Sequence, residues 1–108
     1  MADSIPEPVA SFLAAVNAHR ETAFDESFTV DAVVDDWGKV LTGLDQIKDW
    51  SATEFIGSSP TLDVTAVDIE DGTVTITGDW RSSHANGPSS FRFDLDGDRI
   101  AAMIIRAG

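Results

Sequence analysis

Three glycine-containing turn signals divide the C-terminal half of the chain. The dipeptides Asp71-Gly72, Asn86-Gly87 and Asp96-Gly97 each separate two runs rich in β-branched and aromatic residues. Such pairs suit two-residue hairpin turns, in which positive φ angles are needed. The pattern therefore predicts a four-stranded antiparallel meander over residues 61–69, 73–83, 89–95 and 98–106. The first turn also fits a three-residue loop with a bulge, so its register stays open.

The N-terminal half has the periodicity of helices. Pro6 and Pro8 suit the start of a helix, because the N–H that proline lacks has no partner there. Apolar residues then recur three and four positions apart, which predicts an amphipathic helix to about Arg20. A second, short helix is expected over Glu21 to Phe28.

The segment between the helices and the meander is expected to contain a strand and a third helix. The strand region runs from Ala32 to Leu41, with an irregularity at Gly38. Thr42 is expected to cap the helix, which ends at Gly57 to Pro60. Its buried stripe comprises Leu44, Ile47, Trp50 and Phe55. Helices followed by a meander indicate the α+β class, and 108 residues fit a single domain, residues 1–108.

Turn positions also predict which side chains share a face of the meander, because two-residue turns set the register. With Asn86-Gly87 and Asp96-Gly97 as turns, Trp80 lies opposite Phe93, and Phe93 lies opposite Ile100. One face is then apolar and carries Trp80, Phe91, Phe93, Ile100, Ala102 and Ile104. The far end of the same face is polar and carries Ser82, His84, Ser89 and Arg106.

The opposite face of the meander mixes apolar and charged side chains. The same register places Asp94 opposite Arg99 and Asp79 diagonal to Arg92. The apolar members of this face are Ala101, Met103 and Ile105. A face of this kind often meets another subunit, so a homodimer through the outer sheet face is expected. A solvated face is the alternative.

Two adjacent carboxylates, Asp35 and Asp36, end the strand within the segment Asp31-Ala-Val-Val-Asp-Asp-Trp-Gly38. Neighbouring side chains of a strand point to opposite faces, so one of the two acids faces inward. A buried carboxylate is costly without a partner, which makes it a candidate chemical group. The alternative is an acid that is hydrogen-bonded to the backbone or to Trp37.

Composition excludes several classes of partner. The net charge of −12 disfavours nucleic acid and anionic membranes. The absence of cysteine excludes thiol chemistry, and two distant histidines without helical spacing do not predict a metal site. No apolar run reaches the roughly 20 residues of a membrane helix. No signal peptide is recognised, so a cytoplasmic location is expected. No cofactor is expected.

The order of elements and the local sequences resemble the nuclear-transport-factor-2-like superfamily. The stretches that carry the resemblance to its SnoaL-like and ketosteroid-isomerase-like branches are Phe12-Leu-Ala-Ala-Val-Asn17, Asp31 to Gly38, Gly43-Leu-Asp-Gln-Ile-Lys-Asp-Trp50 and Phe91-Arg-Phe93. The resemblance implies a cystatin-like cone, in which N-terminal helices pack on a strongly curved antiparallel sheet around a pocket. It also implies a small apolar ligand and, often, a dimer.

Ketosteroid isomerases use a strand aspartate as base and form an oxyanion hole from a tyrosine and a protonated aspartate. By resemblance, the base position falls on Asp36, the tyrosine on Phe12 and the protonated aspartate on Ser89. Loss of one oxyanion donor typically costs about 100-fold or more in rate, so steroid isomerisation by that mechanism is not expected. Asp79-Trp80-Arg81 resembles the charged constellation of related epoxide hydrolases, but both charges fall on the outer face.

The sequence therefore predicts a pocket and two classes of function. Asp36 and His84 are the candidate catalytic residues; a partly exposed rim histidine is the alternative for His84. The candidate ligand-binding residues are Phe12, Trp80, Ser89, Phe91, Phe93 and Arg106. The first class is a proton-transfer isomerase, cyclase or dehydratase acting on an apolar substrate. The second is a non-catalytic ligand-binding or dimerisation domain, since a fold alone does not settle function.

Overall fold

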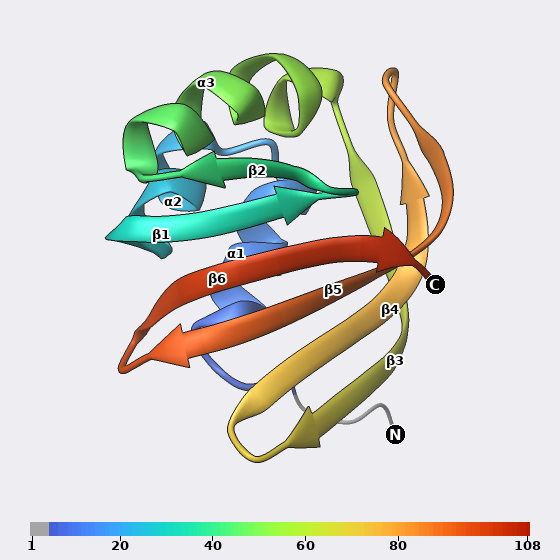
Figure 1. The fold of residues 1–108 in the computed structure, drawn as a ribbon. Helices are drawn as coiled ribbons and strands as arrows, with labels where there is room; N and C mark the ends of the chain where they lie inside the picture. Colours follow the sequence, from blue (N-terminus) through green and yellow to red (C-terminus); the bar gives the residue numbers. More distant parts are fainter. Residues whose placement is uncertain (1–4) are drawn as a thin grey trace.

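Three α-helices pack against a six-stranded sheet in the computed structural model, which describes residues 5–108 (Figure 1). The helices are α1 (Val9–Asn17), α2 (Glu21–Glu26) and α3 (Leu44–Glu54), and a 3-10 helix, η1 (Ile56–Ser58), follows them. The strands are β1 (Phe28–Asp36), β2 (Lys39–Thr42), β3 (Thr61–Glu70), β4 (Thr73–Arg81), β5 (Asn86–Asp96) and β6 (Arg99–Ala107). The predicted α+β class is confirmed.

The strand order is β2-β1-β6-β5-β4-β3. The predicted meander corresponds to β3 through β6, in which every neighbouring pair is antiparallel. The sheet as a whole is mixed rather than antiparallel, because β1 runs parallel to β6. Helix α3 carries the chain from β2 to the far edge of the sheet, so the meander returns and ends beside β1 (Figure 1).

The segment predicted as one irregular strand is a hairpin. Asp36 pairs with Lys39, and Trp37 and Gly38 form a two-residue turn with φ angles of 54° and 94°. The irregularity expected at Gly38 is therefore a complete reversal of the chain. The second helix ends earlier than predicted, at Glu26, because Phe28 already begins β1.

Helix α3 begins without the predicted cap. Its N-cap is Gly43, at a φ of 87°, and no side chain caps the helix. Thr42 was the expected cap, but its backbone N–H instead donates to Oε1 of Gln46 at 2.9 Å. Of the predicted stripe, Ile47, Trp50 and Phe55 are buried. Leu44 is partly buried against the same core.

The connection between β4 and β5 differs from the predicted Asn86-Gly87 turn. Arg81 pairs with Asn86, so the connection comprises residues 82–85. Asn86 does not form the turn because its Oδ1 accepts a hydrogen bond from the backbone N–H of Ser82 at 3.0 Å. Trp80 lies opposite Gly87 rather than Phe93. The shift is an even number of positions, so Trp80 still shares the inner face with Phe91 and Phe93.

A β-bulge in β5 places several side chains of the last strand, β6, on the face opposite to the predicted one. Asp96 pairs with Arg99, so the turn comprises Gly97 and Asp98 rather than the predicted Asp96 and Gly97. The register then shifts between Asp94 and Leu95, so that Asp94 pairs with Ala102. One extra residue reverses the faces of the strand beyond it. The buried residues of β6 are therefore Ile100, Met103 and Ile105. The predicted inner positions of Ala102, Ile104 and Arg106 are wrong, as are the outer positions of Met103 and Ile105.

The expected charge pairs of the outer face are also different. Asp94 does not face Arg99 but Ala102, and Thr73 donates its hydroxyl to Asp94 Oδ1 at 3.3 Å. Asp79 pairs with Arg81 on its own strand, Nε to Oδ2 at 2.9 Å. The Asp71-Gly72 turn has two residues, because Glu70 pairs with Thr73.

Aromatic rings form the centre of the core between the helices and the inner face of the sheet. Phe12 on α1 contacts four other rings, with centroid separations from 5.3 to 6.4 Å. These partners are Phe24, Phe28, Phe55 and Phe93. Two of these contacts are edge-on, one is tilted and one is stacked. Aromatic pairs are favourable beyond the apolar area that they bury.

Within residues 5–108, no helix has both the length and the apolar character needed to cross a membrane.

Candidate functional site

A cavity of about 500 Å³ opens where three segments meet: the β1–β2 hairpin, the C-terminal end of α3 and the β4–β5 connection. This volume lies within the range of small-molecule sites. The residues that line it are Asp36, Trp37, Lys39, Trp50, Glu54, Phe55, Trp80, His84, Ala85, Asn86, Gly87, Pro88, Ser89, Phe91 and Ile105. All three tryptophans of the chain are among them.

Three of the lining residues, Trp50, Phe55 and Trp80, form a continuous aromatic stack. The ring centroids of Trp50 and Phe55 are 4.8 Å apart at an interplanar angle of 25°. Those of Phe55 and Trp80 are 4.7 Å apart at 21°. All three side chains are buried, so the stack joins the end of α3 to strand β4 as one rigid wall of the cavity.

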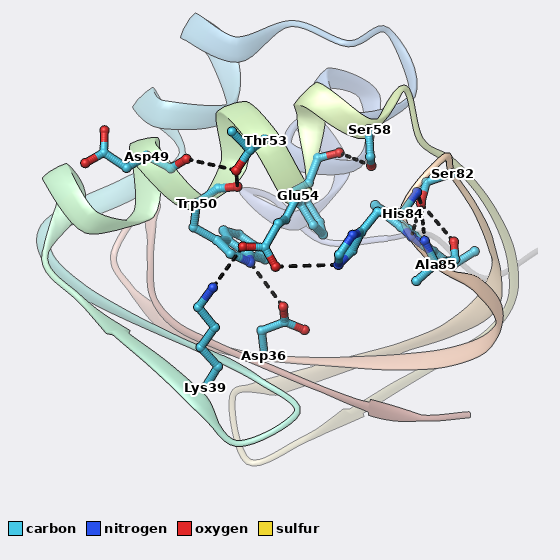
Figure 2. A network of polar contacts seen from close by, with 12 residues as sticks. Asp36, Lys39, Asp49, Trp50, Thr53, Glu54, Ser58, Ser82, His84 and Ala85 are labelled. Atoms are coloured by element: carbon cyan, nitrogen blue, oxygen red, sulfur yellow. Dashed lines mark hydrogen bonds and ion pairs between the residues drawn. The ribbon is translucent and has the colours of Figure 1, made fainter.

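Each tryptophan of the stack donates its indole N–H to a side-chain oxygen. Trp50 Nε1 donates to Oδ2 of Asp36 at 3.1 Å (Figure 2). Trp80 Nε1 donates to Oγ of Ser82 at 3.2 Å. The same hydroxyl oxygen accepts the backbone N–H of His84 at 3.2 Å, and its proton goes to the carbonyl of Ala85 at 2.8 Å. The stack therefore holds Asp36 at one end and the segment carrying His84 at the other.

Asp35 and Asp36 lie on opposite faces of β1. Asp36 is half-buried and lines the cavity, whereas Asp35 does not line it. The carboxylate of Asp35 accepts hydrogen bonds from Arg106, Nη1 to Oδ1 at 3.0 Å and Nη2 to Oδ2 at 2.9 Å. It also accepts the backbone N–H of Gly38 at 2.8 Å. The hydrogen bond from Arg106, followed by that from Gly38, lowers the pKa of Asp35.

Arg106 therefore lies outside the cavity, contrary to the prediction that it binds a ligand there. Its guanidinium reaches Asp35 on the outer face of the sheet, and this hydrogen bond raises its pKa further. The bulge between Asp94 and Leu95 is the cause, because it reverses the face on which Arg106 emerges.

Glu54, in the last turn of α3, bridges the other two segments of the cavity mouth. Its Oε2 lies 2.8 Å from Nζ of Lys39 on β2, and its Oε1 lies 3.5 Å from Nε2 of His84. Figure 2 shows both contacts converging on the one carboxylate, next to Asp36 and Trp50. The contact with His84 is an ion pair only when the imidazole is protonated. Glu54 thus links charges from three different parts of the chain.

The remaining predicted residues divide into two groups. Trp80, Ser89 and Phe91 line the cavity. The hydroxyl of Ser89 donates to the carbonyl of Gly87 at 3.3 Å. Phe12 and Phe93 do not line the cavity; they are buried more deeply, with exposed fractions of 1% and 0%.

Sequence reasoning missed Glu54 and Lys39. Glu54 could have been noticed because it lies four residues after Trp50, on the same side of the helix. Lys39 follows the Trp37-Gly38 turn, so recognition of the hairpin would have placed it beside Asp36. Within residues 5–108, no group of three or more His, Cys, Asp or Glu side chains is arranged to hold a metal ion.

Comparison with known proteins gives one family match. The family model of the SnoaL-like domain matches residues 9–103. No curated protein matches the sequence.

Several solved structures have the same fold. A candidate polyketide cyclase from Sinorhizobium meliloti has a TM-score of 0.84 at 21% identity, over 94% of this chain and 95% of that one. A ketosteroid-isomerase-like protein from Catenulispora acidiphila, in complex with trimethylamine, has a TM-score of 0.78 at 20% identity, over 97% and 88%. A cystatin-fold protein from Novosphingobium aromaticivorans has a TM-score of 0.78 at 14% identity, over 91% and 93%. The predicted cystatin-like fold is confirmed.

Proposed function

The chain belongs to the SnoaL-like domain family, and from that membership we propose that it is a proton-transfer enzyme acting on a small, largely apolar molecule. The observation that carries the proposal is the aromatic stack, with Asp36 held at one end and the His84 segment at the other, in one cavity of about 500 Å³. The reaction class is isomerisation, cyclisation or dehydration. The fold shared with a candidate polyketide cyclase is compatible with cyclisation.

Asp36 is the proposed general base. Within the described residues, its carboxylate accepts one hydrogen bond, from Trp50 to Oδ2, which leaves Oδ1 for a substrate proton. The indole N–H orients the carboxylate and stabilises its charge. A base placed in this way removes a proton from a carbon beside a carbonyl, and the electron pair of the C–H bond becomes an enolate.

His84 is the proposed acid, and Glu54 is the proposed positioning residue. An imidazolium at His84 donates a proton or hydrogen bond to the substrate oxygen, which compensates for the charge of the enolate. Glu54 Oε1 lies 3.5 Å from Nε2 of the imidazole and orients the ring. Lys39 neutralises the second oxygen of Glu54, so the mouth of the cavity does not accumulate negative charge.

The residues at the two positions that form the oxyanion hole in related isomerases favour a second function, non-catalytic ligand binding. Phe12, where the related isomerases have a tyrosine, is buried in the core away from the cavity. Ser89, where they have a protonated aspartate, donates its hydroxyl to the carbonyl of Gly87. Neither position offers the donor on which those isomerases depend.

A homodimer through the outer sheet face is also proposed. Ala102 and Ile104 of β6 emerge on that face and remain partly exposed. Sedimentation velocity at high micromolar concentration tests it: a dimer that Ile104→Asp dissociates supports the proposal, and a monomeric wild type overturns it.

The catalytic proposal is tested with 5-nitrobenzisoxazole, an activated probe of general-base catalysis. The base takes the proton from the ring carbon, the C–H electrons form the nitrile, and the N–O bond breaks to give a coloured phenolate. The wild type is expected to accelerate this opening, and Asp36→Asn to reduce the rate by about 100-fold or more. Asp31→Asn, an exposed acid on the same strand outside the cavity, is the matched control.

The competing outcomes separate the two functions. A wild-type rate no greater than that of an equal concentration of acetate argues against an accessible base. Equal rates for the wild type and Asp36→Asn argue against Asp36 specifically. Ligand binding without turnover by either protein would favour the non-catalytic function.

A further inference from the structure

We propose that Trp37 is a ligand-contact residue that selects flat, unsaturated ring systems at the mouth of the cavity. The inference rests on the proposed function, because it takes the cavity to be a small-molecule site. It concerns a residue that is neither the base nor the acid, and it adds a substrate class: a planar ring compound that is not an anion and that carries a hydroxyl or carbonyl group.

The backbone at Trp37 does not favour a tryptophan. Trp37 and Gly38 have φ angles of 54° and 94°, and they separate the paired residues Asp36 and Lys39. Both angles are positive, as in a type I′ turn, whose first position favours asparagine, aspartate or glycine. A bulky side chain at positive φ is strained, and such strain concentrates at functional sites. Local hairpin stability therefore does not explain this residue.

Core packing does not explain Trp37 either. The residue is 60% exposed, whereas Trp50 and Trp80 are 4% and 7% exposed. An exposed indole contributes little burial to folding. It nevertheless lines the cavity, as do the other two tryptophans of the chain. Trp37 therefore contributes aromatic surface to the cavity but not to the core.

The turn is anchored, so the position of the indole is defined. The backbone N–H of Trp37 donates to the carbonyl of Ile105 at 3.3 Å. The N–H of Gly38 donates to Asp35, which Arg106 holds from the outer face at 2.9 and 3.0 Å. The hairpin of β1 and β2 is thus bonded to β6 through the carbonyl of Ile105 and the side chain of Arg106. These bonds hold Trp37 next to Asp36.

The charges at the mouth disfavour an anionic ligand. Lys39 is paired with Glu54, and His84 faces the same carboxylate. Arg106, the remaining candidate for binding an anion, lies on the outer face with Asp35. A ligand with a negative charge would therefore meet Asp36, while Lys39 and His84, the basic side chains of the lining, both face Glu54. A neutral ring stacked on Trp37, with a hydroxyl toward Asp36 or a carbonyl oxygen toward His84, avoids that repulsion.

The test compares two probes with the same carbon skeleton, 2-naphthol and decahydro-2-naphthol, by isothermal titration calorimetry. Only the first is flat and aromatic. Trp37→Asn is expected to weaken binding of 2-naphthol by about tenfold, with less than about a twofold effect on the saturated alcohol. Trp37→Phe is expected to keep most of the affinity for 2-naphthol. Ile69→Thr, another exposed apolar residue (56%) outside the cavity, is the matched control and should bind both probes as the wild type does.

A stability measurement on the same variants distinguishes a ligand contact from a structural role. Because Asn-Gly suits the turn better than Trp-Gly, Trp37→Asn is expected to raise the melting temperature by about 4 °C or more. A lowered melting temperature would assign Trp37 to the structure and overturn the proposal. So would 2-naphthol affinity within twofold of wild type, an equal loss for both probes, or no binding of 2-naphthol by the wild type. If Trp37-dependent binding is observed but the benzisoxazole is not opened, the inference stands and the catalytic function falls.

Discussion

The indole N–H of Trp50 donates to the carboxylate of Asp36 at 3.1 Å, and this contact joins the end of strand β1 to helix α3. The donor belongs to a buried ring that stacks on Phe55, so it can move little. The acceptor is a half-buried charge at the cavity. A hydrogen bond to a charged group in such a position is worth more than one between neutral groups.

Trp50→Phe is expected to lower the free energy of unfolding by about 1–3 kcal/mol, because the ring stack persists while the bond to the carboxylate is lost. Urea denaturation followed by far-ultraviolet circular dichroism measures it. Trp80→Phe is the matched control, since it removes a bond between neutral groups, to Ser82, and leaves Asp36 untouched. Unchanged stability of Trp50→Phe would mean that the indole N–H contributes nothing to holding Asp36.

Glu54 and His84 are expected to act as a coupled pair. If Glu54 positions His84, then Glu54→Gln and His84→Asn each slow the opening of 5-nitrobenzisoxazole, and the double variant is no slower than His84→Asn alone. A coupling free energy of about 0.5–1 kcal/mol or more is expected from this double-mutant cycle. Lys39→Gln, which removes the other partner of Glu54, is the control. Strictly additive effects would contradict the positioning role.

Asp35 is expected to make the fold sensitive to acid. Its pKa is lowered in the folded state, chiefly by the hydrogen bond from Arg106, so the unfolded chain binds its proton first. The resulting stability is present above the ordinary aspartate pKa and is lost as the pH falls through the lowered value. Asp35→Asn is therefore expected to reduce the urea midpoint at pH 7 and to flatten its decline in acid. An identical pH dependence in the variant would exclude this contribution.

Glu21 is expected to have the opposite effect. Burial raises the pKa of its carboxyl, and repulsion by Asp25 raises it further. The hydrogen bond that the carboxylate accepts from Ser51 lowers this pKa, but by less than burial raises it. Stability is therefore lost as the pH rises from the ordinary glutamate pKa through the raised value. Glu21→Gln keeps the acceptor for Ser51 and removes the charge, so it is expected to raise the urea midpoint at pH 7 but not at pH 3. A lower midpoint at pH 7 would show that the charge stabilises the fold.

Much of the fold could be predicted because its signals are local. The periodicity before Arg20 and the β-rich runs after Thr61 each depend on neighbours within a few residues. Two hairpin registers could not be predicted. One depends on the Asn86 side chain bonding to Ser82, and the other on a bulge beside Asp94. Both are contacts that form only when two strands are already side by side.

The candidate site was predictable only in part. Alternation along β1 was enough to expect one inward carboxylate between Asp35 and Asp36. The partners of these acids were not predictable, because Arg106 lies 71 positions from Asp35 and Trp50 lies 14 from Asp36. Glu54 was missed for the same reason: it reaches Lys39 and His84 from the other side of the cavity mouth.

By itself, the sequence determined the α+β class, the meander and the presence of an acid on the inner side of β1, since these follow from local periodicity and turn chemistry. Only the tertiary structure decided which groups share the cavity. It moved Arg106 to the outer face through one bulge and brought Glu54 between Lys39 and His84. It also turned Trp37 toward the cavity on a two-residue hairpin. The reason is that strand register and helix placement are set by long-range pairing, and a shift of one residue reverses the face on which a side chain emerges.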